Sequence, residues 1–345
     1  MIHMNKNKRS FMNNYKKIGI SALAGSLAAM SAQAEVGLTG AAVATYMDDS
    51  VNYVTGTGGN AFGQQTNLTF TNSGELDNGW TVDIVGYFND ATGTSISSTN
   101  MKLGMGDMGT IVFAEAGGTA ANGIDDVIPS AYEEAWDAGN DTSYAHHFGS
   151  ITNSGAVEYQ SPAFDMMGAS VSVTAAYDPQ GGVANRDHDA ITAAGTTYGS
   201  GKAYTAKIVW EGLTIGAGSE EADGYATAAG YGSATGYAKY SMGPVTIGYQ
   251  ESYNDMAAGA VDYEAEQWGV SFAVNDDLTI SWQSYDDTKT AIMGTAAVTQ
   301  EFSGVAASYT SGGMTFAVAQ VDVDNTGHAS GNNSEHVEMS LSFAF

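Results

Sequence analysis

The sequence predicts an all-β fold, a transmembrane antiparallel β-barrel of about 16 strands whose long third loop folds into the lumen. Three observations support this prediction. Many segments of about ten residues alternate apolar and polar side chains, as strands with one lipid-facing side do. No apolar run after residue 34 reaches the roughly 18 residues that a membrane helix needs. The connections between segments alternate between short and long, as the turns and loops of an outer-membrane barrel do.

Residues 1–34 are predicted to be a signal peptide that is removed. A basic stretch precedes a short apolar run at 18–29, and Ala32-Gln33-Ala34 supplies a small-x-small cleavage site. Met12 is an alternative translation start. Residues 35–345 are then a single barrel domain, since no linker or internal repeat divides them.

The charge of the chain excludes one class of partner. Five of the 11 basic residues lie within 1–34, so the remainder has six bases against 38 acids, a formal charge near −32. Nucleic-acid binding is therefore not expected, because it depends on lysine and arginine neutralising phosphates. The chain has no cysteine, so neither a disulfide framework nor thiol chemistry is expected.

The expected strands are read from the alternation of side chains, since neighbouring residues of a strand face opposite sides. In the first, Val36 and Leu38 share the outward face with the small residues that follow. In the last, Met339, Phe343 and Phe345 face outward, while the serines between them face inward. The sixteen segments are 36–44, 64–72, 80–88, 101–106, 110–116, 155–161, 169–177, 204–210, 213–219, 236–242, 245–253, 267–274, 278–285, 299–310, 314–323 and 337–345.

The connections distinguish the two ends of the barrel. The short ones are expected at 106–109, 211–212, 243–244, 275–277 and 311–313. The long ones are expected at 47–62, 178–201, 220–233, 254–266, 286–298 and 324–334. Tryptophan and tyrosine fall near the strand ends, as in the aromatic girdles of membrane proteins; these residues are Trp80, Trp210, Trp282, Tyr204, Tyr240 and Tyr249.

The longest interval without a strand pattern is 117–152, predicted to be the constriction loop. It contains aromatic residues, among them Tyr132 and Trp136, which offer apolar area for packing and argue against disorder. Its carboxylates, together with Glu115 on the preceding strand, are predicted to set a negative field in the pore. The acidic candidates are Glu115, Asp125, Asp126, Glu133, Glu134, Asp137 and Asp141.

Three stretches resemble general porins of the Gram-negative outer membrane. MKLGMGDMGTIVFAEAGG resembles their fourth and fifth strands leading into the third loop, and NDTSYAHHFGSITNSGAVEYQSP resembles the exit from that loop. The last nine residues, VEMSLSFAF, resemble the terminal signal for barrel assembly. The resemblance implies a homotrimer in the bacterial outer membrane, surrounded by lipid. Each subunit would form a water-filled channel for passive diffusion of small hydrophilic solutes and ions.

The chain departs from that family in its basic residues. Porins of this kind commonly set arginines opposite the acidic loop, but here the only arginine after residue 34 is Arg186, in an expected outer loop. The inward basic candidates are Lys102, Lys207 and Lys239. Because carboxylate rings favour cations, a cation preference is expected.

Alternatives of other classes stay open at this point. In a substrate-specific channel, Tyr132 and Trp136 would stack on a sugar-like solute. Asp187-His188 resembles the acid–histidine pairs of barrel hydrolases, and a surface adhesin is a further reading. No Gly-x-Ser-x-Gly elbow or zinc-spaced histidine pair is present, so no enzyme is expected.

No cofactor is expected to be required. Asp322 and Asp324 place oxygen ligands on alternate positions before a glycine, a pattern that could hold Ca²⁺. The alternative interpretation is a polar turn at a strand end. Clustered loop carboxylates are a second candidate for Ca²⁺, because neighbouring like charges cost energy unless neutralised.

Overall fold

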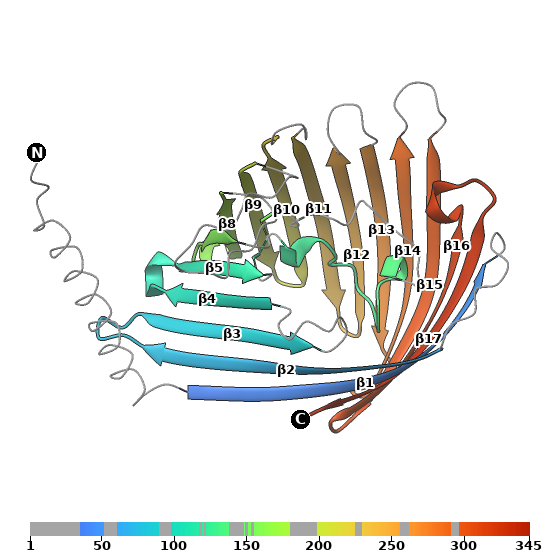
Figure 1. Ribbon diagram of the computed structural model, residues 1–345, viewed down its shortest axis with the longest axis horizontal. Coiled ribbons are helices and arrows are strands. Elements are labelled where there is room, and N and C mark those ends of the chain that lie inside the picture. Colours follow the sequence, from blue (N-terminus) through green and yellow to red (C-terminus); the bar gives the residue numbers. More distant parts are fainter. Residues whose placement is uncertain are drawn as a thin grey trace, which may run out of the picture.

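The computed structural model forms one closed antiparallel sheet (Figure 1). It describes residues 35–51, 61–89, 98–116, 119, 120, 122–137, 148, 151, 152, 155–179, 199–224, 230–255, 262–290 and 297–345. The signal-peptide prediction for 1–34 concerns residues outside this part of the chain. None of the helical turns that are described is long or apolar enough to span a membrane.

Seventeen strand segments make up the sheet in the described residues. They are β1 (Glu35–Val51), β2 (Phe62–Glu75), β3 (Thr81–Asn89), β4 (Ser98–Gly104), β5 (Thr110–Ala116), β6 (Ala156–Gln160), β7 (Phe164–Met166), β8 (Ala169–Asp178), β9 (Gly201–Trp210), β10 (Leu213–Ala222), β11 (Tyr231–Met242), β12 (Val245–Asp255), β13 (Asp262–Ala273), β14 (Leu278–Thr290), β15 (Val298–Ser311), β16 (Met314–Asp324) and β17 (Asn333–Ala344).

The seventeen segments correspond to sixteen barrel strands. β6 and β7 both pair with β8, one after the other along its length. The stretch between them contains Pro162, which has no N–H to donate to the ladder, so a single strand is interrupted there. The predicted sixteen-stranded antiparallel barrel is therefore confirmed.

The barrel closes where β1 pairs with β17, and β1 also pairs with β2 on its other edge (Figure 1). The C-terminal residue completes this seam: the Gly40 N–H donates to the Phe345 carbonyl at 2.7 Å, and the Phe345 N–H donates to the Gly40 carbonyl at 2.9 Å. The Phe345 ring lies over Gly40, in the space that a Cβ would occupy. Closure leaves no unpaired sheet edge for another chain to extend.

The two faces of the sheet differ in the way that a membrane barrel requires. Large apolar side chains are exposed on the outer face, among them Trp210, Trp282 and Phe343. Buried polar side chains alternate with them on the inner face, including Gln250 and Gln267. A water-soluble sandwich would place these two classes the other way round.

The strands extend further into the predicted long loops than the alternation suggested. β10 continues to Ala222 and β14 to Thr290, whereas the sequence predicted loops from residues 220 and 286. Four of the eight residues in these extensions are Asp or Glu, and the sequence analysis placed them in loops. Beyond the apolar band, a strand's outward side chains meet water, so carboxylates stand there without interrupting the ladder.

Candidate functional site: an acidic segment on the inner wall

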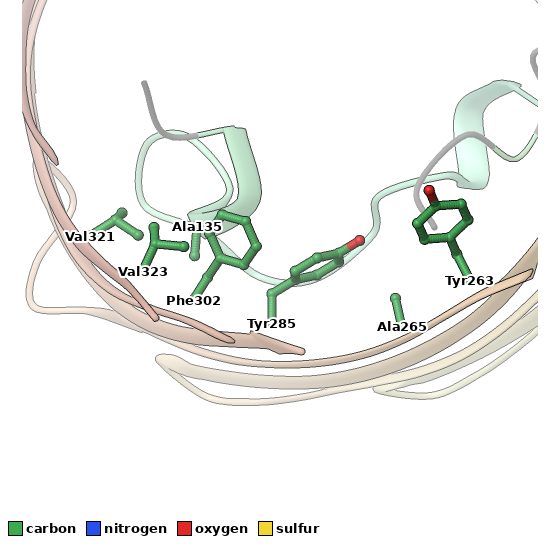
Figure 2. Close-up of a cluster of buried hydrophobic side chains, with 7 residues drawn as sticks. All are labelled: Ala135, Tyr263, Ala265, Tyr285, Phe302, Val321 and Val323. Atoms are coloured by element: carbon green, nitrogen blue, oxygen red, sulfur yellow. The ribbon is translucent and has the colours of Figure 1, made fainter. Parts of the chain in front are cut away.

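Residues 122–137, here called the acidic segment, lie between β5 and β6 in the chain. They contact strands that come much later in the sequence. The segment begins with the single turn η2 (Asn122–Ile124) and ends with η3 (Ala135–Asp137). Its contacts are with inward-facing residues of β10 to β17, the face opposite the exposed apolar side chains. Figure 2 shows the turn that carries Ala135 on the concave side of these strands.

Side chains of the wall bind the backbone of the segment. The N–H of Val127 donates to Gln250 Oε1 at 3.0 Å, and Gln250 Nε2 donates to the carbonyl oxygens of Ile124 and Asp125 at 3.0 and 2.8 Å. The Ala131 N–H donates to Ser281 Oγ at 2.9 Å. Buried backbone groups need such partners wherever no regular structure supplies them.

Gln283 binds the segment at two points. Its Oε1 accepts from the Ala135 N–H at 2.7 Å, and its Nε2 donates to the Pro129 carbonyl at 3.2 Å. The amide therefore spans the segment between residues 129 and 135, and holds both against β14.

The entry to the segment is held on the other side of the barrel. The Ala120 N–H donates to both carboxylate oxygens of Glu158, at 3.0 and 2.8 Å. Glu158 is fully buried on β6. The Glu158 side chain thus anchors the backbone at Ala120 to β6.

An apolar cluster completes the contact (Figure 2). The Phe302 and Tyr285 rings meet edge to face with centroids 5.4 Å apart, and Trp136 packs against the cluster. Ala135 is the member that the acidic segment contributes. The other members lie on β13 to β16, and the full set is Ala135, Tyr263, Ala265, Tyr285, Phe302, Val321 and Val323.

Five predicted acids of the segment have raised pKa values caused first by burial. Burial and the neighbouring charge of Asp126 raise the pKa of Asp125 to about 8. Burial, followed by repulsion from Glu338 and Asp137, raises the pKa of Glu133 to about 8. Burial and the charge of Asp126 raise the pKa of Glu134 to about 7.

The pKa values of the remaining two carboxylates of the segment are also raised. Burial raises the pKa of Asp126, and burial together with Glu338 raises the pKa of Asp137. Glu133 and Glu134 line one small cavity together with Glu338 of β17. The structure thus brings together five of the predicted acids.

Two predicted acids are placed differently. Glu115 lies on β5 where the register with β4 shifts: Asn100 pairs with Ala114 and Thr99 with Ala116, so Glu115 has no directly opposite residue. The alternation of faces is interrupted at such a bulge, so its assignment to the pore stays a prediction. Asp141 lies outside the described residues, as do Asp187 and His188.

The predicted loop aromatics are engaged with the wall. The Tyr132 hydroxyl donates to Glu338 Oε1 at 2.5 Å, and Trp136 packs against the apolar cluster. Their stacking on a sugar-like solute stays a prediction.

The three predicted lysines lie on inward positions of other strands. Lys102 of β4 is directly opposite Asp83 of β3. Lys207 of β9 and Lys239 of β11 flank β10, opposite Gly216 and Thr214 respectively. In a ring of sixteen strands β9 is eight strands from β17, so Lys207 and Glu338 are on opposite walls.

A second set of carboxylates faces outward, and the sequence analysis did not single it out. Five occupy directly opposite positions on five neighbouring strands, β12 to β16, and are here called the carboxylate ladder. Its members are Glu251, Glu266, Asp286, Glu301 and Asp324. Directly opposite like charges are destabilising, so the carboxylate ladder lowers the stability of the barrel when no cation neutralises it.

The calcium candidates lie on this outer face. Asp322 and Asp324 of β16 are exposed, on the side opposite the buried Val321 and Val323. Within the described residues, no group of three or more histidine or acidic side chains is arranged to hold a metal ion. Calcium binding stays a prediction.

Sequence reasoning missed the wall residues that hold the segment. The sequence analysis did not single out Gln250, Ser281, Gln283, Glu158 or Glu338. One sequence pattern could have indicated them. Gln250 follows Gly248, and Gln283 follows Ser281, two positions later on the same strand face. That pattern is expected where backbone approaches a sheet and needs hydrogen-bond partners.

Comparisons with known proteins agree with this architecture. The family model described as Gram-negative porin matches residues 19–328. No curated protein matches the chain significantly. The solved structure of a porin covers 90% of this chain and 100% of its own, with a TM-score of 0.63 and 19% identity.

Two further solved structures share the fold. OmpF of Salmonella typhi, in complex with daunomycin, matches with a TM-score of 0.66 and 15% identity over 90% of this chain and 97% of its own. OmpT of Vibrio cholerae, an outer membrane protein in a trimer form, matches with a TM-score of 0.64 and 10% identity over 90% and 99%.

The family and the fold are those of channel proteins of the bacterial outer membrane, and not those of enzymes. The family model extends over most of the chain, including the acidic segment and strands β1 to β16. The chain belongs to the Gram-negative porin family.

Proposed function

We propose that this porin forms a water-filled, cation-preferring channel for passive diffusion of small hydrophilic solutes and ions, and that the acidic segment is its constriction. The observation that carries the proposal is the binding of the segment's backbone by Gln250, Ser281 and Gln283 of the inner wall. A segment held there reduces the free cross-section of the barrel and presents its carboxylates to passing solutes.

The distribution of charge supports the preference for cations. The acidic segment carries five carboxylates and no lysine or arginine, and Glu338 adds a sixth from the wall. Four lysines occupy inward positions of the described strands: Lys102 on β4, Lys207 on β9, Lys239 on β11 and Lys289 on β14. Because carboxylate rings attract cations and repel anions, the imbalance favours potassium over chloride.

The test is the reversal potential of the folded protein in a planar bilayer under a potassium chloride gradient. A stable conductance with a cation-selective potential is expected. At pH 9, where Glu134 with its pKa of about 7 is ionised, Glu134→Gln should reduce the selectivity. Glu266→Gln on the outer face should leave the selectivity unchanged. The two variants remove the same charge, so only their positions differ.

The outcomes separate the parts of the proposal. Anion selectivity, or equal effects of Glu134→Gln and Glu266→Gln, would refute the role of the acidic segment and retain the channel. Absence of any conductance from folded protein would refute transport.

We also propose that the protein is a homotrimer. One of the matched structures, OmpT of Vibrio cholerae, is described as a trimer form. The outward positions of β1 include Ala42 and Ala44, whose small side chains allow another subunit to approach closely. Light scattering in detergent, with the detergent mass subtracted, is expected to give three subunits, and a monomer mass would refute the proposal.

A further inference from the structure

A row of small residues crosses the inner wall beneath the acidic segment. Gly248, Gly269, Gln283 and Gly304 are successive cross-strand partners on β12, β13, β14 and β15. Three of these four adjoining positions are glycine, and this trio is here called the glycine row. The remaining position is Gln283, which binds the segment at both Pro129 and Ala135.

Each glycine of the row lies directly under an atom of the segment. A Cβ on Gly248 would overlap Pro129 Cδ and lie 3.2 Å from Pro129 Cγ. A Cβ on Gly269 would overlap Ile128 Cγ2 and lie 2.9 Å from the Pro129 carbonyl oxygen. A Cβ on Gly304 would lie 3.2 Å from the Cβ of Ala135 and 3.0 Å from Val321 Cγ2 of the neighbouring strand.

Backbone conformation does not explain these glycines. All three lie within regular strands, and none has the positive φ that other residues rarely adopt. Glycine weakens a strand because it loses more conformational entropy and offers no side chain to pack. A close approach of another backbone is the remaining reason for glycine within a strand.

We infer that the glycine row sets how deeply the acidic segment seats against the wall, and thereby the free cross-section of the channel. This inference rests on the proposed constriction and identifies residues that determine its size. The row is flanked by fixed points on either side of Pro129, because Gln250 accepts from the Val127 N–H and Gln283 accepts from the Ala135 N–H. A methyl group at Gly248 therefore displaces residues 128 and 129 toward the channel axis, at the expense of the 3.2 Å hydrogen bond from Gln283 Nε2 to the Pro129 carbonyl. The hydrogen bonds of the Val127 and Ala135 N–H groups to the wall stay in place.

The size of the effect follows from the overlap. Carbon atoms in contact prefer about 3.5–4.0 Å, so the segment must move by about 1 Å to accommodate a methyl group at Gly248. Conductance follows the cross-section of the narrowest part. A displacement of about 1 Å in a constriction a few ångströms in radius lowers single-channel conductance by roughly a third to a half.

The experiment compares four proteins in planar bilayers: the unchanged chain, Gly248→Ala, Gly236→Ala, and Gly248→Ala combined with Pro129→Ala. Gly236 lies on the outer face of the adjacent β11, opposite Glu251, and its Cβ would meet nothing within 4 Å. Its variant therefore controls for the replacement of a strand glycine without contact to the segment. Gly248→Ala is expected to lower conductance, Gly236→Ala to leave it unchanged, and the double variant to restore it, because Pro129→Ala removes the ring carbons that overlap.

Equal conductance of Gly248→Ala and the unchanged protein would overturn the inference and leave the proposed channel intact. Failure of the double variant to restore conductance would also overturn it, because the loss would then not come from the overlap with Pro129. If Gly248→Ala does not fold, Gly304→Ala replaces it, because its Cβ meets Ala135 at 3.2 Å without overlap. A smaller decrease is expected there, and none would overturn the inference.

Discussion

The cation selectivity of the channel should decrease between pH 9 and pH 6, well above the range in which exposed carboxylates titrate. Burial raises the pKa of Asp125 and Glu133 to about 8 and that of Glu134 to about 7. A group with a pKa of 8 is about nine-tenths ionised at pH 9 and about one-hundredth ionised at pH 6. Acidification across this interval thus removes up to three negative charges from the constriction.

The magnitude follows from Coulomb's law. A unit charge acts on an ion about 8 Å away in water with about 0.5 kcal/mol, and with opposite sign on a cation and an anion. The difference between the two ions is about 1 kcal/mol per carboxylate, and screening in 0.1 M salt reduces it to roughly half. Loss of three charges then lowers the cation-to-anion permeability ratio about tenfold, since 1.4 kcal/mol corresponds to a factor of ten.

The assay is the reversal potential at fixed salt gradient, measured from pH 9 to pH 4 in half-unit steps. The midpoint is expected between pH 7 and 8. Glu266→Gln serves as a control, because its carboxylate faces outward and its removal should leave the profile unchanged. A midpoint near pH 4 to 5 would show that the carboxylates are fully hydrated and would refute the burial argument.

The same pKa shifts fix the sign of the effect on stability. A carboxyl group whose pKa is raised in the folded protein binds its proton more tightly there than in the unfolded chain. The seated segment is therefore most stable below the unfolded pKa of about 4, and its stability falls as the pH rises through 8. Thermal unfolding in detergent should accordingly show a lower midpoint at pH 9 than at pH 6.

Three further outcomes are expected. Ala135→Cys with Gly304→Cys should form a disulfide in this otherwise cysteine-free chain and retain conductance, because the two Cβ positions are 3.2 Å apart, close to the Cβ–Cβ distance of about 3.5–4.5 Å in disulfides. A gel shift on reduction checks the cross-link, and its absence would contradict the contact between the segment and β15. Phe302→Ala should lower stability by about 3–5 kcal/mol, measured by urea unfolding, because the ring is 1% exposed. Glu266→Gln with Asp286→Asn should raise stability by about 0.2–1 kcal/mol per removed like-charge pair, and a decrease in the same assay would contradict the cost assigned to the ladder.

The sequence predicted the membrane-facing side of the barrel well, for a physical reason. Lipid contact requires an apolar side chain at every second position, so Leu38, Trp282 and Phe343 indicate both strand and face without any tertiary information. Strand ends were predicted less well. Past the apolar band both faces are polar, and Glu221 and Asp286 extend strands where composition suggests a loop.

The partners of the acidic segment could not be predicted from alternation. The pattern places Gln250 and Glu338 on the inner face, but it does not say which of the many inward residues a loop more than 100 residues away will meet. The height of a residue along the barrel axis depends on the register of every intervening strand pair. Alternation does not determine that register, because a shift of two residues keeps every side chain on the same face. Glu115 shows the other limit, since a bulge interrupts the alternation at that position.

The seam between β1 and β17 has a consequence for biogenesis. Residues near position 41 pair with residues near position 344. The backbone groups on this edge of β1 therefore gain their hydrogen-bond partners only after β17 has been synthesised. Until the C-terminal strand is present, the nascent sheet exposes two open edges, which are templates for association with other chains. A chain that lacks only its last dozen residues would thus lose β17 and, with it, the closure of the barrel. The fold therefore requires that the open edge of β1 be protected from association with other chains during export.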